Sequence, residues 1–464
     1  MRIRIEETIC AISTPPGKGG IAVIRVSGPA ALATAKKIAP GLNKKQIESH
    51  KAYFCEIIDL KNAKVDEVLV TYFVHGKSFT GEEVIEISCH GSTYITQKIL
   101  DLLIENGCSM ADRGEFTFRA FMNNRIDLVQ AESVLSLIDS QNELSAKMAL
   151  RQLDGHISKQ FLKLESDLTW CLAHIEASID FSTEGLDIID NSVLIEKVKI
   201  ILKEIYQLIN SYQSGRLLKD GVKVVLVGEP NVGKSSLLNL LLQNEKAIVT
   251  EIAGTTRDII EGATVHDGVK YLISDTAGLR ETTDLVEKIG VDRSRQEALK
   301  ADVLAFVLDV NERDWETSFA LFKEVGGSKN LFLVNKVDQA PEISKAEITK
   351  KLQSYQANIN PEQVILTSAL DPKARSSVLD NVKTTIGSLS YLEEAMISSA
   401  RQFEKAKYAA DMIEVSLKEL EKNSGAEFVA MYLKDALVSL QQILGHAYDD
   451  QIMDRVFKEF CLGK

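Results

Sequence analysis

The feature that most constrains this 464-residue chain is a glycine-rich loop directly after an apolar run. Residues 228–235 read GEPNVGKS and fit the pattern G-x-x-x-x-G-K-[ST], and residues 222–227 (VKVVLV) predict a buried strand before them. In such a loop the backbone N–H groups turn toward phosphate oxygens, Lys234 reaches the β- and γ-phosphates, and Ser235 can ligate magnesium at a helix N-terminus. The pattern predicts a doubly wound α/β domain that binds a nucleoside triphosphate.

Two later motifs predict the base. Asn335-Lys336-Val337-Asp338 follows an apolar run, at the sheet edge where open α/β sheets bind ligands. Asp338 can accept hydrogen bonds from N1–H and the exocyclic amine of guanine, whereas adenine would leave this carboxylate unpaired at a cost of roughly 1 to 3 kcal/mol. Thr367-Ser368-Ala369 can offer a backbone N–H to the guanine O6. The predicted nucleotide is therefore GTP.

Two further motifs predict the magnesium side of the site. Asp275-Thr276-Ala277-Gly278 follows a strand-like run and supplies a carboxylate and a glycine N–H for the γ-phosphate. Residues 254–258 (GTTRD) are typical of a switch loop, in which Thr256 closes on magnesium beside Ser235. The residues predicted to bind GTP are Asn231, Val232, Gly233, Lys234, Ser235, Ser236, Thr250, Glu251, Ile252, Ala253, Gly254, Thr255, Thr256, Asp275, Thr276, Ala277, Gly278, Asn335, Lys336, Asp338, Ser368 and Ala369.

Composition and charge disfavour several other classes of protein. No run approaches the ~18 apolar residues of a membrane span, and residues 1–7 are too charged for a signal peptide, so we expect a cytoplasmic protein without a membrane partner. Six cysteines without C-x-x-C spacing predict free thiols rather than disulfides or a zinc site. A net charge of -12 disfavours broad electrostatic binding of nucleic acid, so any RNA contact is expected to be local or assisted.

Proline placement and periodicity predict the domain organisation. No proline lies between Pro40 and Pro230 or after Pro372, and apolar residues recur at helical spacing in residues 194–208 and 433–444. Helical segments therefore flank the nucleotide-binding part, which we expect to be inserted between them. The predicted segments are an α+β domain at 1–119, a first helical part at 120–215, a P-loop GTPase at 216–386, and a second helical part with a Cys-Leu-Gly-Lys tail at 387–464.

Short segments outside the nucleotide motifs carry a family signature: residues 14–25 (TPPGKGGIAVIR), 80–86 (TGEEVIE), 89–91 (CHG), 114–116 (GEF), 128–132 (LVQAE), 179–181 (IDF) and 461–464 (CLGK). With the GTPase motifs, they make the chain resemble the MnmE (TrmE) family of tRNA-modification GTPases over nearly its full length. Phe118 departs from the family, which usually has a polar or charged residue there. Arg125 stands where many relatives have lysine, which keeps the charge but changes the geometry.

The resemblance implies a second site and several partners. The N-terminal domain would be folate-binding-like and would form a homodimer, with 5,10-methylenetetrahydrofolate or 5-formyltetrahydrofolate held by Arg25, Glu86, Arg125 and Lys464. Cys461 would lie near the one-carbon unit, as a reactive thiol or a buried one. With the FAD-dependent partner MnmG (GidA), in a heterotetramer, the protein would add an aminomethyl or carboxymethylaminomethyl group to C5 of the wobble uridine in certain tRNAs.

Hydrolysis needs a group that Ras-type GTPases supply as glutamine after D-T-A-G, where this chain has Leu279. Asn231 offers a carbonyl for a monovalent cation beside the β- and γ-phosphates. The resemblance implies that this cation is potassium, that Thr250, Ile252 and Thr255 complete its site, and that Glu287 orients the attacking water. The predicted catalytic residues are Glu287, Lys234 and Cys461.

Two other functions stay open. A ribosome-assembly or RNA-binding regulatory GTPase would share the T-T-R-D, D-T-A-G and N-K-x-D motifs, but such proteins typically append a basic RNA-binding domain, and co-purified folate would tell the two apart. A helical scaffold with a silent nucleotide site is disfavoured because Lys234, Ser235, Thr256 and Asp275 are all present.

Overall fold

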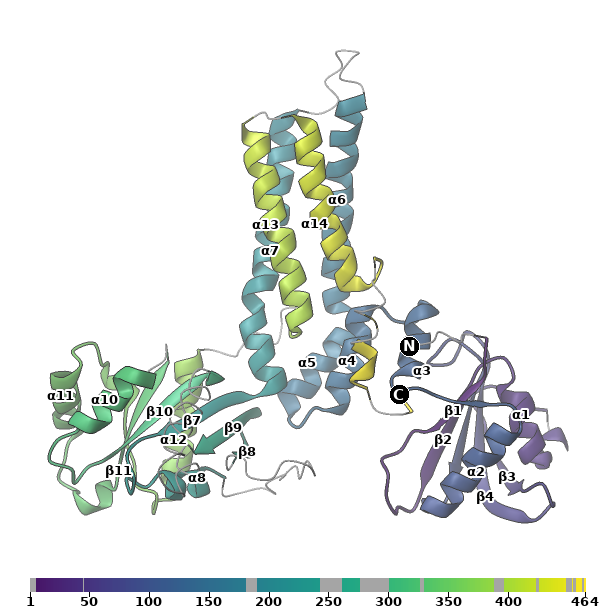
Figure 1. The fold of residues 1–464 in the computed structure, drawn as a ribbon, viewed down its shortest axis with the longest axis horizontal. Helices are drawn as coiled ribbons and strands as arrows, with labels where there is room; N and C mark the ends of the chain where they lie inside the picture. The colour runs from purple at the N-terminus through teal and green to yellow at the C-terminus, as the bar shows by residue number, and fades with distance from the viewer. Residues whose placement is uncertain are drawn as a thin grey trace, which may run out of the picture. The chain divides into compact units, whose positions relative to one another are not determined.

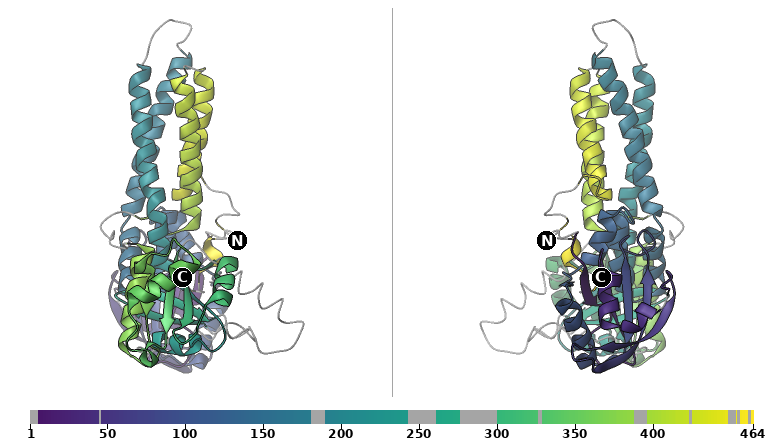
Figure 2. Two further views of the ribbon diagram at one scale, coloured as in Figure 1. Left: turned by 90° about the vertical axis from the view of Figure 1, so that its left-hand side faces the viewer. Right: turned by 90° about the vertical axis from the view of Figure 1, so that its right-hand side faces the viewer.

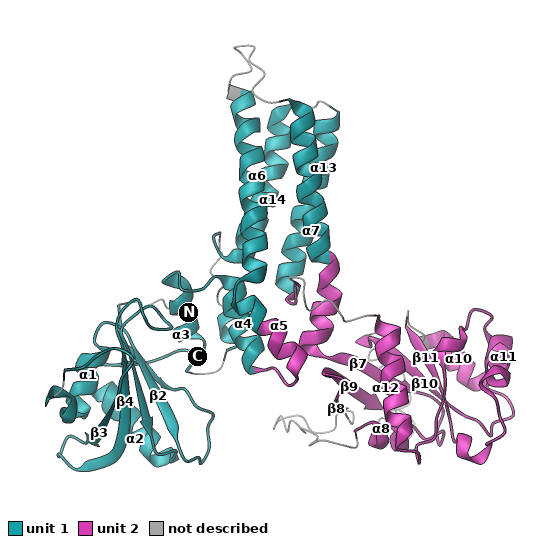
Figure 3. Cartoon of the chain, turned by 180° about the vertical axis from the view of Figure 1, so that it is seen from behind, with its two compact units in different colours: residues 1–138, 150–209, 400–464 teal, residues 139–149, 210–399 magenta. Residues whose placement is uncertain are grey.

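The structure is a computed structural model of the whole chain. The residues it describes are 6–44, 46–180, 190–242, 261–275, 300–325, 329–387, 396–422, 425–447, 453, 456–460 and 463–464. They form two units (Figure 3): residues 1–138, 150–209 and 400–464, and residues 139–149 and 210–399. Each unit is described by itself below, and the bounds of the four predicted segments stay predictions.

Alternating apolar residues near the N-terminus form a six-stranded sheet with the order β3-β4-β5-β2-β1-β6. In β2 (Ala22–Ser27), for example, Ala22, Ile24 and Val26 are buried on one face, as a period of two predicts. β1 pairs with β6 in parallel, and the other neighbours are antiparallel. The other strands are β1 (Ile9–Ile12), β3 (Ala52–Ile58), β4 (Lys64–Phe73), β5 (Val84–Cys89) and β6 (Ser109–Met110).

Helices cover this sheet differently on its two faces. α1 (Ala31–Ile38) and α2 (Thr93–Glu105) pack on the face of Ile24 and close the main core, next to the short 3-10 helix η1 (Pro40–Lys44) (Figure 1). α3 (Glu115–Met122) lies against the other face beside β1, where Phe116 packs on Ile9 and Ala11. The predicted α+β fold of this part is confirmed.

Four long helices run alongside one another (Figures 1 and 2): α6 (His156–Asp180), α7 (Asn191–Asp220), α13 (Ala400–Glu421) and α14 (Ala426–Leu444). All of them belong to the first unit except the last part of α7, from Asn210 on, which belongs to the second. The residues predicted from helical spacing, such as Val198, Ile205 and Leu440, are buried between them. α4 (Leu128–Ile138) and α5 (Glu143–Leu153) precede the bundle in the chain. Within the described residues, no helix is long and apolar enough to cross a membrane.

The second unit is a doubly wound sheet with the order β12-β11-β10-β7-β9-β8. Neighbouring strands are parallel except for the antiparallel pair β8–β9. α8 and α12 cover one face and α10 and α11 the other, with an apolar core on each side, so the predicted α/β class is confirmed. The strands are β7 (Val222–Val227), β8 (Glu261–His266), β9 (Val269–Asp275), β10 (Val303–Asp309), β11 (Asn330–Asn335) and β12 (Val364–Leu366). The helices are α8 (Lys234–Leu242), α10 (Glu316–Val325), α11 (Lys345–Tyr355) and α12 (Lys373–Ile386), with 3-10 turns η4 (Val337–Gln339) and η5 (Pro361–Gln363).

Candidate functional site

The predicted phosphate loop joins β7 to α8. Gly233 has a φ of +99°, and a Cβ placed there would lie 2.2 Å from Nδ2 of Asn335, so only glycine fits. The Lys234 ammonium folds back over the loop and donates to the carbonyl oxygens of Gly228 at 3.0 Å and Glu229 at 2.8 Å. The loop therefore has the curl of a phosphate cradle, with a buried cation at its centre.

The predicted magnesium side lies next to this loop. The Ser235 hydroxyl, in the first turn of α8, donates to Oδ2 of Asp275 at 2.9 Å. Asp275 ends β9 and is buried beside Leu226 of β7. Because magnesium prefers hydroxyl, carboxylate and water oxygens, this pair fits the ion that the sequence predicts.

The predicted guanine loops meet at the ends of β11 and β12. The buried Asn335 side chain donates to the Val232 carbonyl oxygen at 2.9 Å and accepts from the Ala369 amide at 3.2 Å. The Ser368 hydroxyl donates to Oδ1 of Asp338 at 2.5 Å. The structure therefore brings N-K-x-D, T-S-A and the phosphate loop together at one edge of the sheet, as predicted for a nucleotide site.

Asp309 belongs to this edge but is not predicted from the sequence. It ends β10 beside Asn335, and its Oδ2 accepts from the Lys336 ammonium at 2.6 Å. The same ammonium donates to the Asn231 carbonyl oxygen at 2.8 Å. The signal is that Asp309 ends the apolar run 303–308, just as Asn335 ends its own run.

Several predicted residues lie outside the described residues. They are Thr250, Glu251, Ile252, Ala253, Gly254, Thr255, Thr256, Thr276, Ala277, Gly278, Glu287 and Cys461. The roles predicted for them as potassium ligands, second magnesium ligand, water-orienting glutamate and cysteine near the one-carbon unit therefore stay predictions, as does the role of Asn231 as a potassium ligand.

Arg25 and Glu86, two of the predicted folate contacts, lie opposite each other on β2 and β5. The Arg25 guanidinium donates to Oε1 of Glu86 through Nε at 3.0 Å and through Nη2 at 2.7 Å. The Phe116 ring centroid lies 5.6 Å from Cζ of Arg25. This half-buried ion pair is on the sheet face opposite the main core, beside α3.

A buried arginine connects the two neighbouring motifs, T-G-E and G-E-F. Arg119 is 1% exposed and donates to both carboxylate oxygens of Glu82 at 3.1 Å and to Oε1 of Glu115 at 2.9 Å. The Ser27 hydroxyl donates to Glu82 at 2.6 Å. Arg125, the third predicted folate contact, is exposed beside Gly81 in the same region.

The end of the chain lies against its first strand. The Ser13 hydroxyl donates to the Gly463 carbonyl oxygen at 3.1 Å, and Lys464 is half-buried. Gly463 has a φ of +86°, and a Cβ there would lie 2.3 Å from the Ile12 carbonyl oxygen. Because Ile12 pairs with Ile24 on β2, the tail contacts the strand next to the one that carries Arg25.

Packing explains the unusual Phe118 and the state of the cysteine thiols. The rings of Phe118 and Phe457 meet edge to face at a centroid distance of 5.2 Å, so the unusual Phe118 anchors the C-terminal segment. Burial, with the nearby Asp66 carboxylate, raises the pKa of the Cys89 thiol to about 11, which keeps it protonated at neutral pH. The five described cysteines, Cys10, Cys55, Cys89, Cys108 and Cys171, are free, as predicted, and all five are buried.

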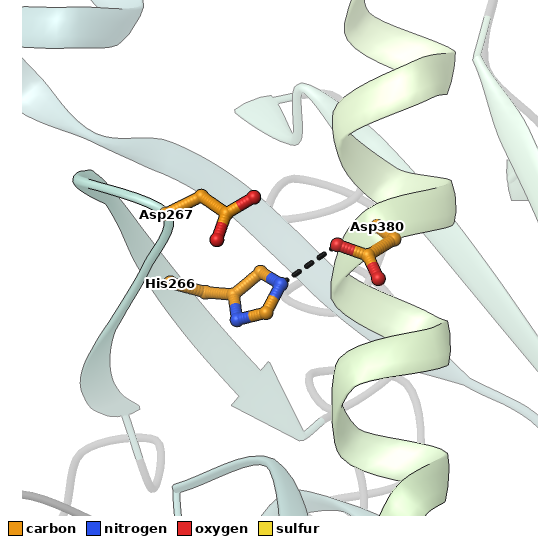
Figure 4. Close-up of side chains that lie close together, drawn as sticks. All are labelled: His266, Asp267 and Asp380. Atoms are coloured by element: carbon orange, nitrogen blue, oxygen red, sulfur yellow. Dashed lines mark hydrogen bonds and ion pairs between the residues drawn. The ribbon is translucent and has the colours of Figure 1, made fainter.

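A separate cluster lies where the β8–β9 turn meets α12 (Figure 4). His266, Asp267 and Asp380 each place one side-chain nitrogen or oxygen atom within 4.8 Å of the other two. His266 is hydrogen-bonded to Asp380 at 2.7 Å, and Lys383 pairs with Asp267 at 3.0 Å. Since both carboxylates already have partners, we interpret the cluster as a structural contact that holds the β8–β9 turn against α12.

Comparisons with known proteins give a consistent result. Residues 8–125 match the family described as GTP-binding protein TrmE N-terminus, and residues 128–461 match the MnmE helical domain. The chain is 49% identical to the tRNA modification GTPase MnmE of Bdellovibrio bacteriovorus, over 99% of this chain and 98% of that protein. It is 37% identical to the tRNA modification GTPase MnmE of Clostridioides difficile, over 99% of this chain and 100% of that protein. Among solved structures it is similar to the G domain of the T. maritima FeoB iron transporter, with 28% identity, a TM-score of 0.28, and coverage of 35% of this chain and 98% of that one.

Proposed function

The chain belongs to the MnmE family of tRNA modification GTPases, and from that premise we propose which reaction it serves. With an FAD-dependent partner of the MnmG (GidA) type, it adds an aminomethyl or carboxymethylaminomethyl group to C5 of the wobble uridine in certain tRNAs. A reduced folate is the one-carbon donor. The observation that supports this proposal is that the Arg25–Glu86 pair and the chain's last residues reach the same N-terminal sheet in a chain that also carries a P-loop site.

GTP hydrolysis is the activity of the P-loop unit. Lys234 supplies a fixed positive charge at the phosphate loop, and Ser235 with Thr256 is proposed to hold magnesium, which neutralises phosphate charge when bound. Asn231, with Thr250, Ile252 and Thr255, is proposed to hold potassium in place of an arginine finger. Glu287 is proposed to orient the attacking water.

The one-carbon site is proposed on the face of the N-terminal sheet beside α3. Folate carries an anionic glutamate tail and a pterin with hydrogen-bond donors. The cations Arg25, Arg125 and Lys464 would bind the anionic tail, and the Glu86 carboxylate would accept hydrogen bonds from the pterin. The ion pair between Arg25 and Glu86 supports this pairing of roles, because a bound ligand would find both a cation and a carboxylate on adjacent strands.

A homodimer through the N-terminal domain is part of the proposal. Phe54 and Leu69 are direct cross-strand neighbours on β3 and β4, and they are 59% and 48% exposed. Adjacent exposed apolar side chains on an outer strand favour a protein contact. The partner protein and the tRNA are proposed from the family alone.

Mass spectrometry of tRNA nucleosides tests the proposed reaction. A strain lacking this gene should lose the C5 modification at the wobble uridine, and wild-type protein should restore it. Arg25→Ala should fail to restore the modification while its GTP hydrolysis stays within about twofold of wild type, because the two sites belong to different units. Normal modification in the deletion strain, together with defective ribosome assembly, would favour the regulatory GTPase instead.

A further inference from the structure

The Asp309 carboxylate is fully engaged at the nucleotide edge of the second sheet. Its side chain is 13% exposed. Oδ2 accepts from the Lys336 ammonium at 2.6 Å, and Oδ1 accepts from the backbone amide and side-chain amide of Asn311 at 2.9 and 3.0 Å. Such charge-assisted contacts fix a carboxylate in one orientation.

Lys336 joins two loops that are far apart in the chain. Its ammonium contacts both Asp309 and the carbonyl oxygen of Asn231, at 2.8 Å. Both Lys336 and Asn231 have left-handed backbones, with φ of 63° and 64°. A non-glycine residue in this region costs of order 1 kcal/mol, so each loop needs outside contacts to hold its conformation.

We propose that Asp309 is a positioning residue for guanine nucleotides, which holds the Lys336 ammonium on Asn231 and so sets the spacing between the base loop and the phosphate loop. This role rests on the GTP site described above. Without the Asp309 charge, the ammonium is left with neutral oxygen acceptors at these two loops, and the loops separate more easily. Because GDP and GTP both span these loops, the effect falls on the affinity for both nucleotides rather than on the hydrolysis step.

Fluorescent GDP and GTP titrations of the full-length Asp309→Asn variant test the proposal. The variant keeps the size of the side chain and removes its charge, so Kd should rise roughly 10- to 100-fold for both nucleotides, as expected for a lost charge-assisted hydrogen bond. In steady state, KM for GTP should rise while kcat stays within about threefold. An unchanged Kd in the folded variant overturns the proposal.

Asp302 provides a matched control on the same sheet. It lies at the other end of β10, where it pairs with Arg216 and accepts from the Lys223 amide at 2.9 Å. Asp302→Asn also removes one half of a partly buried ion pair, and should leave nucleotide Kd within about twofold. An equal loss of affinity in both variants would mean that general stability of the sheet, rather than positioning, controls binding.

A double-mutant cycle tests whether Asp309 acts through Lys336. If it does, the Kd of the double variant Asp309→Asn, Lys336→Met should be less than about twice the Kd of Lys336→Met. If the two residues act independently, the factors by which the single changes raise Kd would multiply in the double variant. Should Asp309→Asn fail to fold, Asp309→Glu replaces it in the titrations and in the double-mutant cycle. This variant keeps the charge but displaces the carboxylate, so Kd should rise above the wild-type value by less than the factor expected for Asp309→Asn. If wild type itself fails to bind GDP, the nucleotide site is wrong; tight wild-type binding with an unaffected variant rejects only the positioning role.

Discussion

Replacing Arg119 with methionine should loosen the N-terminal sheet, because it removes the cation between two buried carboxylates. Glu82 and Glu115 are 11% and 10% exposed at their side chains, and Arg119 donates to both. After the change, Glu82 keeps the Ser27 hydroxyl and Glu115 keeps the Asp112 amide, but neither has a charged partner in this network. Breaking a buried ion pair in this way costs about 3 to 5 kcal/mol.

Hydrogen exchange with mass spectrometry can measure this cost in the full-length protein. Peptides that contain β2 (Ala22–Ser27) and β5 (Val84–Cys89) report on the strands that this network supports. A loss of about 3 to 5 kcal/mol in opening free energy corresponds to exchange that is roughly 10² to 10⁴ times faster at pH 7. Peptides from the P-loop unit should be unchanged and serve as the internal control.

A triple variant separates lost charge pairing from lost packing. Arg119→Met combined with Glu82→Gln and Glu115→Gln removes all three charges, and should exchange more slowly than Arg119→Met alone, since no buried charge is then unpaired. Exchange less than about threefold faster in Arg119→Met than in wild type would refute the reasoning, because the network would then stabilise the sheet no more than a surface ion pair does.

Three further outcomes are expected. Ser235→Ala should remove most of the increase in GTP affinity that millimolar Mg²⁺ produces, roughly tenfold or more, and a full Mg²⁺ response in a nucleotide titration would contradict the predicted ligand. Gly463→Val should release the chain's end, because a side chain there overlaps the Ile12 carbonyl oxygen, and exchange at residues 12–14 should then rise at least tenfold. Burial opposes ionisation of Asp309, but hydrogen bonds from Lys336 and Asn311 outweigh burial and hold the pKa of this carboxyl below its ordinary value. The ionised carboxyl therefore stabilises the folded protein fully when the pH is above the pKa of Asp309 in the unfolded chain. This stabilisation is lost as the pH falls through the pKa of Asp309 in the folded protein. In urea unfolding, the advantage of wild type over Asp309→Asn should therefore stay constant from about pH 7 to 5 and shrink below about pH 4.

Short-range patterns were sufficient to predict the elements of this fold. The phosphate loop, the strands before N-K-x-D and T-S-A, and the helical spacing of Val198 to Leu208 each depend on residues close together in the chain. The doubly wound sheet then follows, because apolar strands alternating with helices have few other ways to bury both faces.

Long-range pairings could not be predicted in the same way. Arg119 meets Glu82 across 37 residues, and Lys336 meets Asn231 across 105. Both contacts depend on which strands become neighbours, and neither has a local spacing of its own. The role of Phe118 also emerges only when Phe457, from the other end of the chain, packs against it.

The contact between Ser13 and Gly463 spans 450 residues of sequence. At a synthesis rate of roughly 5 to 20 residues per second, Ser13 is synthesised between about 20 and 90 seconds before Gly463. The surface at Ile12 and Ser13 therefore stays uncovered during synthesis of the helical and GTPase parts, and closes only afterwards. Docking of the tail is thus a late assembly step, whose timing depends on translation rather than on the stability of the sheet that receives it.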